Sequence, residues 1–181
     1  MKDIYVFLMT GFEEIEALGT VDILRRAGLS VKTVSLVATK EVTSSRNVTV
    51  IADTMFADVK DFAGAEMLVL PGGTPKYNEH EAMKKEVLAF ANSGKNVAAI
   101  CASPMVLGGL GLLKGKNATC YPGFEQYLEG ANLQTDKAVV IDGNIITGKG
   151  PGLTIDFALK LVEIIAGKAK RDEIAAGLLV K

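Results

Sequence analysis

Cys101 is the residue whose type and position point most directly to chemistry. It follows the apolar run at residues 97–100, and Ala102-Ser103-Pro104 after it is a typical start of a helix. A buried strand that turns sharply into a helix presents the residue at the turn at the carboxyl end of the sheet, where open α/β folds bind ligands. The helix N-terminus would lower the pKa of the thiol, and the N–H groups of Ala102 and Ser103 could face an oxyanion. The pattern predicts a nucleophile elbow; the alternative is that Cys101 is a small apolar core residue.

The apolar runs of the chain predict the sheet that would carry this elbow. Several are continuous where a half-exposed strand would alternate, which is typical of parallel strands buried on both faces. The expected strands are residues 4–9, 31–36, 67–70 and 97–100. Two antiparallel pairs are also expected, at 42–44 with 48–51 and at 138–141 with 145–147. The second pair flanks Asp142-Gly143-Asn144, a strong hairpin signal because Gly and Asn accept positive φ.

Helical patterns alternate with these strands. Apolar residues recur at helical spacing in four segments, each followed by or close to a glycine: residues 14–27, 83–91, 153–165 and 172–179. Asn78 is the expected N-cap of the second of them. Strands alternating with helices predict an α/β fold with a doubly wound, mostly parallel sheet sandwiched by helices, in a single domain of residues 1–181.

The composition excludes several other classes of protein. Hydrophobic residues make up 49% and charged residues 23% of the 181 residues, which is typical of an ordinary globular protein. Twenty Lys and Arg against 21 Asp and Glu give a net charge of −1, so no broad positive field exists for nucleic acid. The uncharged run at residues 96–113 is broken by Pro104 and several glycines, so no membrane span is expected. Two cysteines do not make a disulfide scaffold, and we expect free thiols in a cytoplasmic protein.

Four separated motifs resemble the ThiJ/PfpI superfamily, and within it the branch of the Parkinson-disease protein deglycase and the bacterial YajL proteins. They are Gly11-Phe12-Glu13-Glu14-Ile15-Glu16, Leu70-Pro71-Gly72-Gly73, Ala98-Ala99-Ile100-Cys101-Ala102 and Gly150-Pro151-Gly152. Residues 21–28 and Ser45-Arg46 fit as well, so the resemblance covers nearly the whole chain. It implies a flavodoxin-like fold of the class I glutamine amidotransferase type and a site that needs no cofactor.

The resemblance also implies roles for individual residues. Cys101 would be the nucleophile, Glu16 the carboxyl partner of its sulfur, and Gly73 a donor to the oxyanion together with Ala102. Arg46 would reach the site from the neighbouring subunit of a homodimer. The residues alone leave blander alternatives open: Glu16 as a solvated helix charge, Gly73 as a tight strand exit and Arg46 as a surface turn residue.

The departures from the family pattern bear on the activity. Tyr121 stands before Pro122, where several relatives have a histidine, and Ala102 follows the cysteine, where the protease branch has one. The only histidine, His80, is expected at the surface, and no cluster has metal-ligand spacing. A cysteine protease needs a base that also protonates the leaving amine, so proteolysis or amide hydrolysis is disfavoured. Cys120 is interpreted as a buried or incidental thiol, with a resolving role for Cys101 as the alternative.

The resulting expectation is a cofactor-free, cysteine-dependent enzyme for small reactive carbonyls. The resemblance implies glyoxal, methylglyoxal and their early adducts on proteins as substrates. Glu16 is expected to move the proton, and Tyr121, which departs from the family pattern, could donate a hydrogen bond. The alternative is a redox-sensing stress protein or holdase in which Cys101 is oxidised, because an exposed thiol of low pKa is the first to be attacked. The elbow is common to both functions and does not separate them.

Overall fold

A mixed seven-stranded sheet forms the centre of the molecule in the computed structural model, which describes residues 2–180. Its strand order is β10-β11-β7-β6-β1-β2-β5, and all neighbours are parallel except β10 and β11. These strands are β1 (Ile4–Leu8), β2 (Val31–Ser35), β5 (Thr54–Met55), β6 (Met67–Leu70), β7 (Asn96–Ile100), β10 (Val139–Asp142) and β11 (Ile145–Gly148). The doubly wound, mostly parallel sheet predicted from the sequence is confirmed.

The central strands are apolar throughout because each serves two hydrophobic cores. In β1, Ile4 and Val6 belong to one core, whereas Tyr5 and Phe7 point to the other face. The same alternation divides Met67 and Leu68 of β6 between the two cores. Successive side chains of a strand point to opposite faces, so a strand covered by helices on both sides has no solvent-exposed position where a polar residue is favoured.

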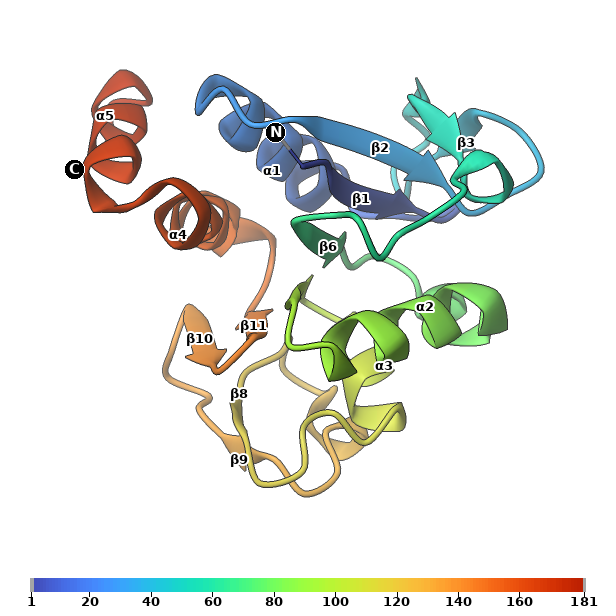
Figure 1. Cartoon of the computed structure of the whole chain (residues 1–181). Coiled ribbons are helices and arrows are strands. Elements are labelled where there is room, and N and C mark those ends of the chain that lie inside the picture. Colours follow the sequence, from blue (N-terminus) through green and yellow to red (C-terminus); the bar gives the residue numbers. More distant parts are fainter. Residues whose placement is uncertain (1, 181) are drawn as a thin grey trace.

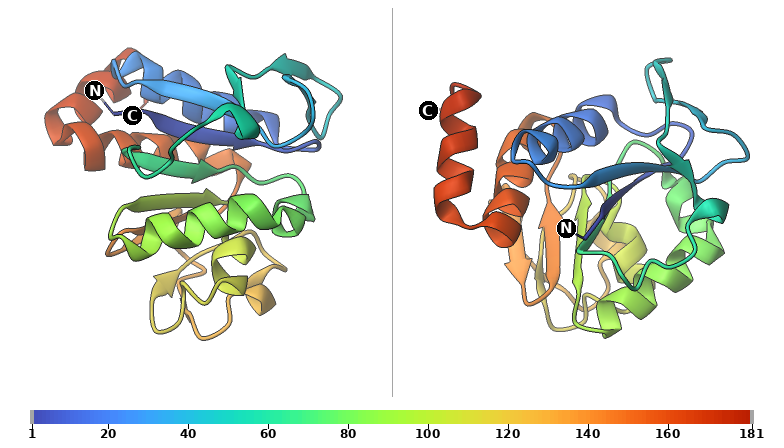
Figure 2. Two further views of the ribbon diagram at one scale, coloured as in Figure 1. Left: turned by 45° about the vertical axis from the view of Figure 1, so that its right-hand side comes forward. Right: turned by 45° about the horizontal axis from the view of Figure 1, so that its top comes forward.

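Helices cover both faces of the sheet. They are α1 (Glu14–Arg26), α2 (Glu81–Asn92), α3 (Pro104–Gly109), α4 (Thr154–Ala166) and α5 (Lys168–Gly177). α1 and α4 pack together on one face, and α2 and α3 lie across the sheet from them (Figures 1 and 2). Short 3-10 helices connect several elements: η1 (Phe56–Asp58), η2 (Pro75–Glu79), η3 (Glu125–Tyr127) and η4 (Pro151–Leu153).

Two small sheets lie outside the main one. The antiparallel pair of β3 (Glu41–Thr43) and β4 (Thr49–Ile51) confirms the predicted excursion, and it extends away from the body of the molecule (Figure 2). β8 (Asn117–Ala118) and β9 (Asn132–Leu133) form a short parallel pair. Among residues 2–180, no helix is long and apolar enough to cross a membrane.

Two details of the helices differ from the sequence-based expectation. The N-cap of α2 is His80, whose Nδ1 accepts the N–H of Met83 over 3.0 Å, and not Asn78, which lies in the preceding 3-10 helix. His80 is therefore no free surface residue; its ring also packs edge-on against Phe56, with centroids 5.2 Å apart. The last helix begins at Lys168, a turn earlier than the expected segment 172–179.

Candidate active site

The turn at Cys101 has the strained backbone of a nucleophile elbow. Its φ is +66°, a left-handed conformation that residues with a side chain seldom adopt. The N–H of Cys101 donates to the carbonyl of Gly148 on β11 over 2.9 Å, and the hydroxyl of Ser103 donates to the carbonyl of Pro71 at the end of β6. Hydrogen bonds to both neighbouring strands thus hold the turn between β7 and α3 in place.

The second residue of the candidate site is Glu16, which lies in the first turn of α1. The N-cap residue Glu13 accepts the N–H of Glu16 over 2.8 Å and so begins α1 with Glu16 in its first turn. That turn faces the sheet, and the Glu16 side chain is fully buried. Its Oε2 accepts the N–H of Gly72 over 2.8 Å, and its carboxyl is within hydrogen-bonding reach of the Cys101 thiol. The structure brings together the two residues predicted as nucleophile and carboxyl partner.

Burial sets the protonation of this pair. It raises the pKa of Glu16 to about 7, against the stabilising hydrogen bonds from Cys101 and Gly72. Burial and the charge of Glu16 also raise the pKa of Cys101 above that of a free thiol. The predicted lowering of the cysteine pKa is therefore wrong: the thiol is only 8% exposed. Burial thus disfavours the charged form of both groups, and the carboxyl and the thiol compete for the same proton.

Gly72 packs against Cys101 and Glu16, and Gly73 follows it. Each position requires glycine for a different reason. A Cβ at Gly72 would lie 2.6 Å from Cβ of Cys101 and 2.7 Å from Oε2 of Glu16. Gly73 has a φ of +103°, and a Cβ there would lie 2.3 Å from the backbone nitrogen of Glu13. From the sequence a role is expected only for Gly73 and not for Gly72, although the Gly-Gly pair is the signal for both.

The backbone N–H groups of Ala102 and Gly73 are candidates for binding an oxyanion, and that of Ala102 lies beside the sulfur. The N–H of Ala102 faces the thiol of Cys101, where it favours the thiolate and opposes the rise in pKa. Neither this N–H nor that of Gly73 donates to an oxygen of residues 2–180. Preorganised donors of this kind stabilise the charge that develops on a carbonyl oxygen under attack.

Tyr121 lies on the other side of the elbow. Its N–H donates to the carbonyl of Cys101 over 2.8 Å, and its ring packs against Gly150, where a Cβ would lie 3.1 Å from Cδ2 of the ring. The side chain is 44% exposed. The tyrosine is thus fixed beside the nucleophile through its backbone, with its ring at the surface.

Arg46 is not part of this cluster within one chain. It lies in the turn between β3 and β4, where its N–H donates to Oε1 of Glu14 over 2.6 Å and its guanidinium donates to the carbonyl of Ser45. Ser44 and Ser45 also donate to Glu14, so α1 anchors the turn. Within the described chain Arg46 makes no hydrogen bond with Cys101 or Glu16.

Cys120 remains a separate thiol. It is buried in the core, which raises its pKa to about 11, and no disulfide joins it to Cys101. Residues 2–180 contain no group of three or more His, Cys, Asp and Glu side chains placed to hold a metal ion.

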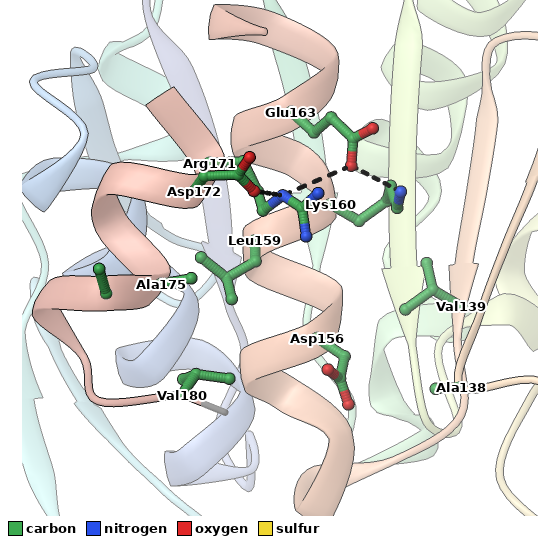
Figure 3. A pocket seen from close by; sticks show the side chains of 11 residues that line it. Ala138, Val139, Asp156, Leu159, Lys160, Glu163, Arg171, Asp172, Ala175 and Val180 are labelled. Atoms are coloured by element: carbon green, nitrogen blue, oxygen red, sulfur yellow. Dashed lines mark hydrogen bonds and ion pairs between the residues drawn. The ribbon is translucent and has the colours of Figure 1, made fainter. Parts of the chain in front are cut away.

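A cavity of about 600 Å³ lies away from the elbow, between α4, α5 and the strand β10 (Figure 3). Its charged side chains pair with one another: Lys160 with Glu163 at 2.6 Å and Arg171 with Asp172 at 2.9 Å. The Cys101 site does not contribute to it, and size alone therefore does not locate the candidate active site.

In the comparison with known families, residues 2–164 match the model of the DJ-1/PfpI family. The chain belongs to the DJ-1/PfpI family. A relative of this family, protein dj-1beta of Drosophila melanogaster, is 40% identical over 99% of this chain and 97% of its own length. The solved structure of Toxoplasma gondii DJ-1 in an oxidised form has a TM-score of 0.93 at 36% identity, covering 99% of this chain and 98% of that one.

A further member of the DJ-1/PfpI family carries an activity in its name. The glutathione-independent glyoxalase DJR-1.2 of Caenorhabditis elegans is 32% identical to this chain over 90% of it and 87% of its own length. The family therefore includes glyoxalase activity.

Proposed function

We propose that this protein is a cofactor-free enzyme in which Cys101 attacks small 2-oxoaldehydes such as glyoxal and methylglyoxal and converts them to hydroxy acids. The observation that carries the proposal is the buried pair of Cys101 and Glu16 with the N–H of Ala102, which has no oxygen partner among residues 2–180, beside the thiol. The glyoxalase among the relatives supports it. Early adducts of the same aldehydes on proteins are a second class of substrate.

The raised pKa values assign Glu16 the role of base. At neutral pH the carboxyl ionises while the thiol keeps its proton, so Glu16 accepts that proton as Sγ bonds to the aldehyde carbon. The carbonyl oxygen gains the electron pair and is stabilised by the N–H groups of Gly73 and Ala102. This replaces the pre-formed thiolate expected from the sequence with a thiol that is deprotonated during attack.

The later steps need no external oxidant or reductant. Glu16 first returns the thiol proton to the oxyanion, which gives a hemithioacetal and leaves the carboxyl free to act as a base again. Glu16 then takes the proton from the former aldehyde carbon and delivers it to the neighbouring carbonyl carbon, while the hydroxyl proton moves to the neighbouring oxygen. The first carbon is thereby oxidised to a thioester and the second is reduced to an alcohol. Water then cleaves the C–S bond, releases the hydroxy acid and returns the proton to Cys101. The net reaction adds one water to one 2-oxoaldehyde and gives one hydroxy acid. The exposed side chain of Tyr121 has a hydroxyl that can donate a hydrogen bond to the substrate.

A redox-sensing or holdase role of Cys101 is the second candidate, and the oxidised form of the Toxoplasma relative favours it. Oxidation requires an accessible thiolate. The burial and raised pKa of Cys101 both reduce the thiolate fraction, so the geometry supports the enzyme better. Peptide hydrolysis is the least supported, because no imidazole lies in the cluster to protonate a leaving amine.

We also propose that the protein is a cytoplasmic homodimer in which the partner's copy of the β3–β4 turn brings Arg46 to the site. An apolar groove of about 440 Å³ between α1 and α4 supports the pairing, with the exposed side chains of Ile15 and Ile155 in its lining. Glu14 links this face to the Arg46 turn, since it anchors the turn from the first residue of α1. A second copy of this chain would cover these apolar side chains.

Lactate formation from methylglyoxal without glutathione tests the enzyme. We expect turnover by the wild type and by Cys120→Ser, which removes the other buried thiol, and loss of at least about 100-fold in Cys101→Ser. Mass spectrometry of Cys101 after mild peroxide treatment runs in parallel. Absence of hydroxy acid from the wild type, together with oxidation of Cys101 under conditions that spare Cys120, would establish the redox role instead.

A further inference from the structure

Two oxygen atoms on the inner face of α1 have no hydrogen-bond partner among residues 2–180. They are Oε1 of Glu16 and Oγ1 of Thr20, and both residues are fully buried. Oε2 of Glu16 is satisfied by Gly72, so only one side of the carboxyl is bonded to the protein. A buried polar atom without a partner destabilises the folded state, and buried oxygens in folded proteins are therefore nearly always bonded to protein or to water.

The spacing of the two residues explains how both oxygens can be satisfied together. Glu16 and Thr20 are four residues apart on one helix, so their Cβ atoms lie about 5–6 Å from each other on the same face. No hydrogen bond joins the two oxygens directly. One water between them would span the gap with two hydrogen bonds of ordinary length. A threonine inside a helix can also bond to the carbonyl four residues earlier, and Thr20 does not do so.

We propose that one ordered water molecule binds between Oε1 of Glu16 and Oγ1 of Thr20, which makes Thr20 a positioning residue for the candidate base. The water donates to Oε1 when Glu16 is ionised, and the Thr20 hydroxyl holds the water. A catalytic role for this water rests on the proposed function, but the presence of the water does not. Gly72 then bonds to Oε2 and the water to Oε1, and Sγ of Cys101 lies on the Gly72 side of the carboxyl.

The consequence of the bound water is electrostatic. Burial is the main cause of the raised pKa of Glu16, and a donor on Oε1 opposes it because it stabilises the ionised form. Replacing Thr20 with Val removes the hydroxyl and keeps the shape of the side chain. The water then loses one of its two protein partners in an apolar surrounding, and the pKa of Glu16 rises further.

Infrared titration of the buried carboxyl tests this without any assay of activity. The band of protonated Glu16, identified by its loss in Glu16→Gln, is followed against pH in four proteins: wild type, Thr20→Val, Thr20→Ser and Thr33→Val. We expect Thr20→Val to raise the midpoint by about one pH unit. Thr20→Ser keeps the hydroxyl and should restore the wild-type midpoint. Thr33→Val on β2 removes a buried hydroxyl that donates to Asp53, so it should lower the melting temperature without moving the midpoint.

Equal midpoints in the wild type and Thr20→Val would overturn the inference, as would a Thr20→Ser midpoint that matches Val. If Thr20→Val does not fold, a crystal structure of the wild type that resolves bound water decides, and empty density between the two oxygens overturns the inference. Because neither readout depends on turnover, a protein without glyoxalase activity could still contain the water. An active enzyme without the water would equally leave the proposed function standing.

Discussion

The N–H of Gly72 donates a 2.8 Å hydrogen bond to Oε2 of Glu16, so a residue at the end of β6 fixes the carboxyl that faces the cysteine. The same glycine leaves the space that Cys101 and Glu16 occupy. Position 72 therefore acts twice, through its N–H and through its lack of a side chain.

Gly72→Ala should abolish most of the carbonyl activity while the chain still folds. The added Cβ would overlap Cβ of Cys101 and Oε2 of Glu16, and neither the strained turn nor α1 can shift without breaking hydrogen bonds. We expect a fall in kcat of at least about tenfold and a loss of stability of about 1–3 kcal/mol. Gly177→Ala is the control, since a Cβ there meets nothing within 4 Å. Full activity in Gly72→Ala would show that the tight packing is not needed.

The pH dependence of turnover should follow Glu16. Below its pKa of about 7 the carboxyl is protonated and cannot accept the proton of Cys101, so kcat/KM should rise with pH and level off above that value. Glu16→Gln, which keeps the shape and cannot act as a base, should lose activity and this rising limb together. A limb that persists in Glu16→Gln would assign the base to another residue.

Stability should fall as the pH rises from 5 to 8. The pKa of Glu16 is about 7 in the folded chain and 4.5 as a free side chain, so the folded state binds the proton more tightly and the stabilisation is lost as pH passes through 7. The shift corresponds to roughly 2–3 kcal/mol over this interval. Urea unfolding at several pH values measures it, and Glu16→Gln should flatten the curve. A wild-type curve already flat across this range would contradict the raised pKa.

Tyr121→Phe should have a modest effect on turnover. The ring keeps its packing on Gly150 and the backbone keeps its bond to Cys101, so only one hydroxyl hydrogen bond is lost. That bond contributes roughly 0.5–1.5 kcal/mol, or about tenfold at most. Tyr127→Phe is the matched control, because Tyr127 is 45% exposed against 44% for Tyr121. Complete loss of activity in Tyr121→Phe alone would show that the phenol performs acid–base chemistry.

The association of two chains depends on the groove between α1 and α4. Sedimentation at micromolar concentration should show a dimer for the wild type and a monomer for Ile155→Asp, which places a charge in the apolar contact. Ile141→Asp on β10 is the control, since Ile141 is 44% exposed and Ile155 is 47% exposed. If Arg46 completes the site across the interface, Ile155→Asp should also lose turnover. A monomeric wild type would remove Arg46 from the site.

The sheet and helices could be predicted because the spacing of apolar residues along the chain follows from which side chains are buried. Strands such as β1 and β6 are apolar at every position since each contributes to two cores, and Gly28 and Gly167 mark the helix ends. The N-cap of α2 could not be predicted, because the residue that accepts the helix N–H is a histidine, which is outside the usual set of Ser, Thr, Asp and Asn.

The residues of the candidate site could be named from the sequence, but the pKa shift of the cysteine could not. The strand-to-helix turn located Cys101, and the family resemblance supplied Glu16. The direction of the cysteine pKa was wrong because a turn at the sheet edge suggests exposure, whereas packing against Gly72 and Glu16 buries the thiol. Thr20 carries no signal in the sequence, since only the three-dimensional structure shows that its hydroxyl lacks a partner.

The three residues that meet at the elbow come from distant parts of the chain: Glu16 and Gly72 are 56 positions apart, and Cys101 lies in the turn after β7. Contacts between such distant segments form only after long loops have closed, which is slow and occurs when the sheet is already assembled. A partly folded chain would therefore contain the cysteine without its carboxyl partner. Recovery of the Glu16 titration during refolding should thus mark arrival at the native state, later than any signal from the local helices.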